Sequence, residues 1–159
     1  MGKTIVQNGV LYKANEDADI VVVPMGVITI ASDAFKYNSR ISSVVLPDSV
    51  TTIESEAFYG CCKLKTVTMS KRVHTLGDRV FANCCNLLNC EFPDSLVTIG
   101  EDVFLNCDVY EIPDSIQLLI ANNEINTMKN RMMKELRESI NEESNQKQHK
   151  SFLTKIFNS

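Results

Sequence analysis

The sequence carries six cysteines and two histidines, the residue types that most often supply a nucleophile or a metal ligand. The cysteines are Cys61, Cys62, Cys84, Cys85, Cys90 and Cys107. Zinc sites need cysteine pairs two to four residues apart that converge on one point, and the two adjacent pairs lack this spacing. Cys61, Cys84 and Cys107 are 23 residues apart, so they mark equivalent positions of a repeat. We therefore predict no metal, cofactor or disulfide, with reduced thiols and the first cysteine of each adjacent pair packed as a small apolar side chain.

The two histidines do not complete a catalytic pair. His74 follows the basic pair Lys71 and Arg72, and His149 lies in a polar stretch near the end of the chain. A cysteine and histidine pair must converge in a cleft, whereas a repeat spreads equivalent positions along its length. A phosphate-binding loop, a dinucleotide fingerprint and a zinc motif are also missing from the sequence. We predict a protein that is not an enzyme and has no catalytic residues.

A 23-residue repeat organises the chain. Its most regular members are Phe35, Phe58, Phe81 and Phe104, each preceded five residues earlier by Ile or Leu. No single unit of this length can bury its apolar side alone, so neighbouring units must stack into one core. A period of 20 to 29 residues with regularly placed Leu or Ile is typical of leucine-rich-repeat solenoids. We expect ladders in which Phe lies over Phe and Ile over Ile.

Each unit also predicts its own strand and turn. In one unit Ile41, Val44 and Leu46 place apolar residues three and then two positions apart, with β-branched residues among them, as in a short strand. Pro47 ends this strand because proline cannot donate a ladder hydrogen bond. A second apolar pair three residues apart follows in each unit, which predicts a second buried side of the coil.

The repeat resembles one known family. The pattern I-x-x-x-A-F-x-x-C-x-x-L-x-x-V-x-L-P-x-S-V is similar to the BspA-type leucine-rich repeat over about residues 20–116. One matching unit consists of Ile53, Ala57, Phe58, Cys61, Leu64 and Val67. The resemblance implies a solenoid with a general protein-binding surface. It implies no catalytic residues.

The predicted fold class is a mainly β repeat solenoid, short and right-handed, with an N-terminal hairpin cap and a C-terminal helix. Residues 1–19 form the N-terminal β cap, since Asn8-Gly9 between apolar residues is a hairpin signal. Residues 20–116 form the solenoid, whose last coil is three residues short. An amphipathic helix over 117–140 and a flexible tail over 141–159 follow.

The helix and the tail leave two interpretations open. Apolar residues recur on one side of the helix at Leu118, Ala121, Ile125, Met128, Met132, Leu136 and Ile140. At least the first half of this stripe could fold back as the C-terminal cap, or the stripe could be a docking or self-association face. In the tail, four apolar residues at helical spacing could rest on a membrane surface or in a partner's groove. These are Phe152, Leu153, Ile156 and Phe157.

The charge distribution and the apolar pattern of the sequence limit the partners and the compartment that we expect. Residues 1–128 carry a net charge of −7 and residues 129–159 a net charge of +3. An acidic body repels phosphate backbones, so we expect no nucleic-acid partner, and membrane contact only through the tail. The start of the chain lacks the apolar stretch of a secretory signal. We expect a cytoplasmic protein, or a surface or secreted one if a signal has been trimmed away.

The predicted function is a non-enzymatic protein-protein interaction module that binds an unidentified protein through the strand face of the solenoid. The outward positions of the strands form two rows, because they alternate with buried ones and stand side by side in adjacent coils. The first row is Ser43, Thr66 and Asn89, and the second is Val45, Thr68 and Glu91. The alternative is an adaptor in which the C-terminal helix and tail bind a partner or a membrane surface and the solenoid is a spacer.

Overall fold

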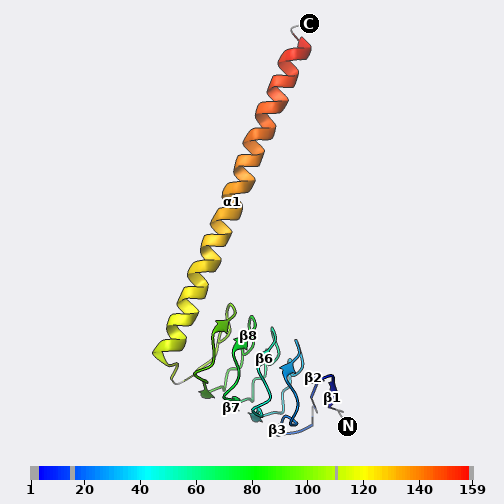
Figure 1. The fold of residues 1–159 in the computed structure, drawn as a ribbon, viewed down its shortest axis with the longest axis vertical. Coiled ribbons are helices and arrows are strands. Elements are labelled where there is room, and N and C mark those ends of the chain that lie inside the picture. The colour runs from blue at the N-terminus through cyan, green and yellow to red at the C-terminus, as the bar shows by residue number, and fades with distance from the viewer. Residues whose placement is uncertain (1–3, 15–16, 110, 158–159) are drawn as a thin grey trace. The chain divides into compact units, whose positions relative to one another are not determined.

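The computed structural model describes residues 4–14, 17–109 and 111–157, and side chains up to residue 146 except those of 143 and 145. The chain forms two compact units, Met1–Asn123 and Glu124–Ser159. The first unit contains the repeats as a β-solenoid (Figure 1). Each of its four coils contributes one short strand to each of two sheets, in which the coil strands pair in parallel. This is the predicted fold class.

The two sheets run along opposite sides of the coils. One sheet has the order β3-β5-β7-β9, and its strands are β3 (Ile20–Val22), β5 (Ser43–Val45), β7 (Thr66–Thr68) and β9 (Asn89–Glu91). The other has the order β1-β2-β4-β6-β8-β10. Its coil strands are β4 (Thr29–Ile30), β6 (Thr52–Ile53), β8 (Thr75–Leu76) and β10 (Thr98–Ile99). Every pair of neighbouring coil strands is in register at a shift of 23 residues, so the sequence period becomes the lateral step of both sheets.

An antiparallel hairpin covers the first coil. It consists of β1 (Ile5–Gln7) and β2 (Val10–Lys13), joined by Asn8 and Gly9. Both turn residues have positive φ, at 50° and 76°, as a two-residue type I′ hairpin turn requires. Leu11 of β2 pairs with Ile30 of β4 and is fully buried. The hairpin therefore extends the aliphatic ladder by one step and closes this end, as the sequence predicted.

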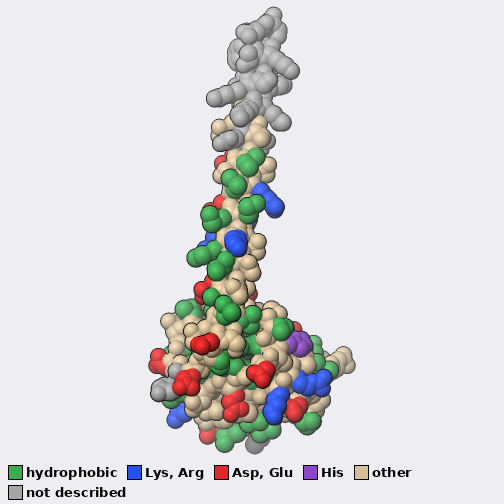
Figure 2. Space-filling model, turned by 60° about the vertical axis from the view of Figure 1, so that its left-hand side comes forward, with side chains coloured by type: hydrophobic (Ala, Val, Ile, Leu, Met, Phe, Trp, Pro, Cys, Tyr) green, Lys and Arg blue, Asp and Glu red, His purple; other side chains and the backbone are tan. Residues whose placement is uncertain are grey.

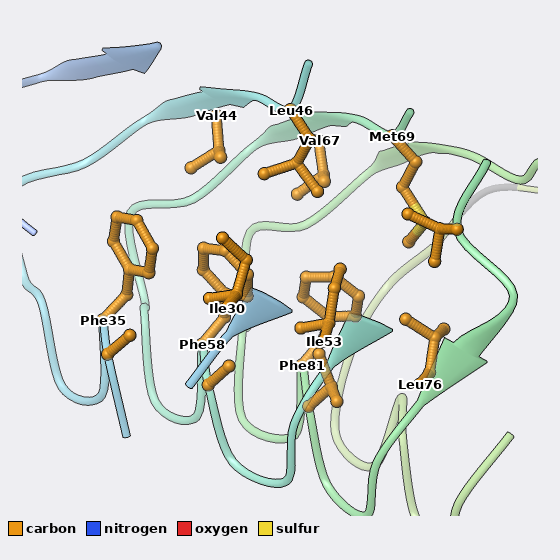
Figure 3. Close-up of a cluster of buried hydrophobic side chains, with 14 of the residues drawn as sticks. Ile30, Phe35, Val44, Leu46, Ile53, Phe58, Val67, Met69, Leu76 and Phe81 are labelled. Carbon is orange, nitrogen blue, oxygen red and sulfur yellow. The ribbon is translucent and has the colours of Figure 1, made fainter. Parts of the chain in front are cut away.

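The core consists of the predicted ladders. Phe35, Phe58, Phe81 and Phe104 stack with ring centroids 4.5, 5.4 and 5.7 Å apart and interplanar angles of 11° to 18°. Figure 3 shows the first three rings side by side in successive coils, and Ile30, Ile53 and Leu76 in a second row on β4, β6 and β8. Phe58 and Phe81 are fully buried. The repeat is thus held together by like side chains in contact across coils.

Each coil turns sharply through residues in the left-handed region. One such position is occupied in successive coils by Tyr37, Gly60, Asn83 and Asn106, with φ between 57° and 69°. Glycine has a second reason to occupy its place here. A Cβ at residue 60 would lie 2.6 Å from Cδ1 of Tyr37, so the tyrosine ring covers a surface that only a hydrogen leaves open.

Helix α1 (Asp114–Phe157) begins in the first unit and closes the last coil. Ile116 is buried, and Leu119 and Ile120 pack against the core. Leu118 begins the stripe whose first half could, by the sequence interpretation, form the C-terminal cap. In the structure Leu118 is 63% exposed. Two apolar stripes share this first part of the helix. Residues 116, 119 and 120 lie about 100° to 200° around the helix from Leu118, so only one stripe can meet the coil.

The second unit holds the rest of α1, in which Ile125, Met128, Met132, Leu136 and Ile140 are exposed. The helix continues to Phe157, where the sequence predicted a flexible tail from residue 141. Residues 141–150 contain no Gly or Pro, and their Glu, Gln and Lys residues are good helix formers. Phe152, Leu153, Ile156 and Phe157 lie outside the residues whose side chains are described, so their docking role stays a prediction. No helix in the described part of the chain is long and apolar enough to cross a membrane.

Candidate protein-binding surface

The outward positions of the β3-β5-β7-β9 sheet form two continuous rows. Ser43, Thr66 and Asn89 are register partners across β5, β7 and β9, and so are Val45, Thr68 and Glu91. Val44 and Val67, between the rows, are fully buried and point into the core. The structure therefore brings the six residues singled out from the sequence onto one face, which we name the strand face.

The strand face begins one coil before the six predicted residues. Ile20 pairs in register with Ser43, and Val22 with Val45, so both rows begin on β3. Ile20 and Val22 are 62% and 69% exposed, and Met25 in the following turn is also exposed. The period was sufficient to find them, because Ile20 lies 23 residues before Ser43. With these residues the face has an apolar end.

A hollow lies at the other end of the strand face. Its volume is about 620 Å³, and its lining includes Thr66, Asn89, Glu91, Phe92, Glu111 and Pro113. It lies beside β9, after which no further strand pairs in the described part of this sheet. The shortened last coil explains this, since the chain reaches Pro113 and helix α1 three residues early. Two carboxylates, from Glu91 and Glu111, make this end acidic. The middle of the face carries only the short side chains of Ser, Thr and Val.

A second polar cluster lies on the turns at the other edge of the coils, and its charges are paired with one another. Lys36 Nζ lies 2.6 Å from Glu56 Oε2 and 2.9 Å from Asp33 Oδ1. Arg79 contacts the other oxygen of Glu56 at 2.8 Å. The hydrogen bonds to Glu56 and then to Asp33 raise the pKa of Lys36. Because Glu56 bridges cations from the coils on either side, this cluster ties coils together.

The lysine of this cluster also lies near two aromatic rings. Lys36 Nζ is 5.9 Å from the ring centre of Tyr37 and 5.7 Å from that of Tyr59. A hollow of about 450 Å³ lies here, lined in part by Tyr12, Tyr37 and Arg40. None of the residues at this edge was among the predicted site residues. One sequence feature indicates this edge: Tyr37 occupies a turn position that is glycine or asparagine in the other coils.

The cysteines occupy structural positions. The Sγ atoms of Cys61, Cys84 and Cys107 donate to the carbonyl oxygens of Phe35, Phe58 and Phe81, at 3.0, 3.1 and 2.8 Å. Cys61 and Cys84 are fully buried, as predicted for the first cysteine of each pair. Burial raises the pKa of the Cys90 thiol, which disfavours the nucleophilic thiolate. Among the described residues no three His, Cys, Asp or Glu side chains are grouped to hold a metal ion.

The histidine that precedes β8 contacts a neighbouring hydroxyl group. His74 is exposed, and its Nδ1 lies 3.0 Å from Thr75 Oγ1. The tautomer of the ring decides which atom donates in this contact. Among the hydrogen bonds of the described residues, none joins His74 to a cysteine, and the side chain of His149 lies outside the described residues.

The model of the BspA type leucine rich repeat region matches residues 5–126 in six copies. The chain belongs to this family. The matched region extends beyond residues 20–116, on which the sequence resemblance rested, into the N-terminal hairpin and the start of helix α1. Leucine-rich-repeat families commonly mediate protein-protein interaction and are typically not enzymes.

Solved structures of bacterial leucine-rich-repeat proteins have the same fold. A leucine rich cell surface protein from Faecalibacterium prausnitzii is 28% identical with a TM-score of 0.59, over 67% of this chain and 31% of its own. A leucine-rich repeat protein from Bacteroides ovatus is 26% identical with a TM-score of 0.57, over 65% of this chain and 29% of its own. One from Bacteroides capillosus, 23% identical with a TM-score of 0.59, is similar in fold over 64% of this chain and 83% of its own.

This BspA-type chain spans less than a third of the length of the first and second of these proteins. No curated protein matches it in sequence. The comparisons thus establish the family and the fold.

Proposed function

We propose that the chain is a non-enzymatic interaction module whose strand face binds a segment of another protein. The observation that carries this proposal is the exposed pair Ile20 and Val22 at the start of the face. Contiguous exposed apolar patches with a polar rim are typical of interaction sites. They lie in register with the residues chosen from the sequence, so the apolar end continues directly into the two rows.

The rigidity of the face favours binding. Its middle is built from Ser, Thr and Val, whose short side chains lose little conformational freedom when a partner covers them. Their backbone is held by parallel pairing with the strands on both sides. A partner that contacts β5 and β7 therefore meets a preformed surface, which lowers the entropic cost of association.

The two ends of the face indicate the chemistry of the partner. Ile20 and Val22 at one end fit an apolar side chain. Glu91 and Glu111 at the hollow beside β9 fit a basic one. A partner segment that lies across the four strands would thus carry an apolar anchor and a Lys or Arg separated by three strand spacings, which is about 14 Å.

Charge substitution on the face tests the proposal. Val45→Lys with Thr68→Lys places two cations in the middle of the face without altering the buried ladder, and we expect captured partners to be lost with little change in stability. The matched control is Ile28→Lys with Val97→Lys, two exposed apolar residues next to strands of the other sheet. Quantitative affinity capture from native lysate measures both. Partners that are lost equally with the control, or kept with the face variant, would contradict the proposal.

A further inference from the structure

Two exposed thiols lie close together across neighbouring coils. Cys62 and Cys85 are 23 residues apart, so they occupy equivalent positions, and both are exposed. Their Sγ atoms donate to the same acceptor, the carbonyl oxygen of Asn83, at 3.7 and 3.5 Å. Desolvation, and after it a hydrogen bond with Cys85, raises the pKa of the Cys62 thiol, which places the two thiol groups within reach of each other. In the sequence each of these cysteines follows another cysteine directly, whereas the stacked coils pair the two exposed ones.

The spacing of the coils sets the distance between the two sulfur atoms. Gly60 N–H donates to Ala82 O at 2.9 Å, and Asn86 Nδ2 donates to Cys62 O, so the coils are tied together on both sides of Cys62. Strands joined in this way lie about 4.8 Å apart, and their equivalent side chains point the same way. A disulfide bond is only about 2 Å long and needs side chains that turn toward each other. Two metal–sulfur bonds of about 2.3 Å in line span roughly 4.6 Å, which matches the spacing of the coils.

The two sulfur ligands select the kind of ion. Thiolates are soft ligands that favour Cu(I), zinc and iron–sulfur clusters. Structural zinc sites and iron–sulfur clusters take four protein ligands, and among the described residues no three His, Cys, Asp or Glu side chains are grouped to hold a metal ion. Cu(I) is stable between two thiolates in a line. The charge of the chain favours a cation as well, since residues 1–128 carry a net charge of −7, and Figure 2 shows several Asp and Glu side chains on the face of the first unit that it presents.

The other cysteines of the ladder are poor competitors for such an ion. Cys61 and Cys84 are fully buried, and their thiols donate to backbone carbonyl oxygens. The thiol of Cys107 is likewise hydrogen-bonded, to Phe81 O at 2.8 Å. An ion that arrives from solvent therefore meets Cys62 and Cys85 first.

We propose that Cys62 and Cys85 form a binding site for one Cu(I) ion, held between their two sulfur atoms in the turns that precede β7 and β9. Binding replaces the proton of each thiol, so two protons are released for each ion bound and the pair of neutral thiols becomes a complex of charge −1. The ion joins two neighbouring coils, and it therefore stabilises the folded chain. This site goes beyond the proposed function and is independent of the strand face.

Competition with a coloured chelator complex measures the binding. The reduced full chain is titrated without oxygen against the Cu(I) complex of bicinchoninate, and we expect it to withdraw one ion per chain. Cys62→Ser and Cys85→Ser should each weaken binding at least about a hundredfold, because a hydroxyl group is not a soft ligand. The matched control, Cys90→Ala, removes a thiol outside the pair and should bind Cu(I) like the unsubstituted chain. Circular dichroism checks that each variant is folded.

The geometry of the site is tested on the Cu(I) complex of the unsubstituted chain. X-ray absorption spectroscopy should show two sulfur ligands around the ion. Sedimentation equilibrium should give the same mass with and without Cu(I), because both ligands belong to one chain. The midpoint of thermal unfolding should rise when Cu(I) is added to the unsubstituted chain or to Cys90→Ala, and should not rise for Cys62→Ser.

Four outcomes would overturn the proposal. A chain that withdraws no Cu(I) from bicinchoninate has no such site. Binding that is unchanged in either serine variant uses other ligands. A mass that doubles as Cu(I) is added means that the ion bridges two chains, and a spectrum with three or more sulfur ligands means that the buried thiols take part. None of these readouts depends on the strand-face partner, so failure here leaves the proposed function standing.

Discussion

Truncation of Phe81 to alanine tests the ladder that holds the solenoid together. The Phe81 ring is fully buried and stacks on Phe58 at 5.4 Å and on Phe104 at 5.7 Å. Phe→Ala changes in cores cost about 3 to 5 kcal/mol, because the transfer free energy is lost and a cavity remains. Two stacked contacts, each worth roughly 0.5 to 1.5 kcal/mol beyond burial, favour the upper half of that range. We expect a loss of about 4 kcal/mol in the free energy of unfolding.

Urea denaturation followed by circular dichroism measures this change. Phe81→Leu is the matched variant, since it keeps most of the apolar volume and should cost only about 1.5 kcal/mol. It also guards against the case in which the alanine variant does not fold, because a domain of this size has roughly 5 to 15 kcal/mol of stability in total. A loss below about 1 kcal/mol for Phe81→Ala would mean that the ring contributes little to the core and that the stacking argument is wrong.

Further predictions concern the thiols, a turn and the tail. Thiol titration of the denatured protein, prepared without reductant, should find all six cysteines free, and recovery of two or fewer would refute reduced ladder positions. Gly60→Ala should cost roughly 1 to 3 kcal/mol in urea denaturation, because a Cβ there meets the Tyr37 ring at positive φ. In a Tyr37→Ala background the same change should cost clearly less, and an equal cost would rule out the contact with the ring. Phe152→Ser with Phe157→Ser should keep the captured partners, whereas their loss would transfer the function from the strand face to the tail.

The ladders of the solenoid were predictable because their determinants are local and repeated. A residue such as Phe58 has its equivalents at fixed steps of 23, and parallel strands in register place equivalents next to one another. Burial, strand position and the outward rows of the strand face follow from that single step. The apolar end at Ile20 and Val22 follows from it as well, although the sequence analysis began the rows one coil later.

The helix was predicted less completely. The residues around Leu118 carry two apolar stripes, and a sequence cannot say which stripe meets the last coil, since both have helical spacing. The continuation of α1 to Phe157 was also missed, because the polar composition of residues 141–150 suits both a flexible segment and a solvated helix. The contact of the Tyr37 ring with Gly60 needs three-dimensional positions, because it joins two turns whose side chains differ between coils.

The sequence by itself thus determined the period, the coil, the core ladders and the family of this protein. The tertiary structure alone decided where the repeat stops presenting a regular surface: the side of α1 that closes the last coil, the hollow beside β9 and the ring packed over Gly60. The physical reason is that a repeated residue has identical neighbours on both sides, so its environment is set by the period. A residue at an end or in an irregular turn contacts a segment of different sequence, and only packing selects among the faces it could present.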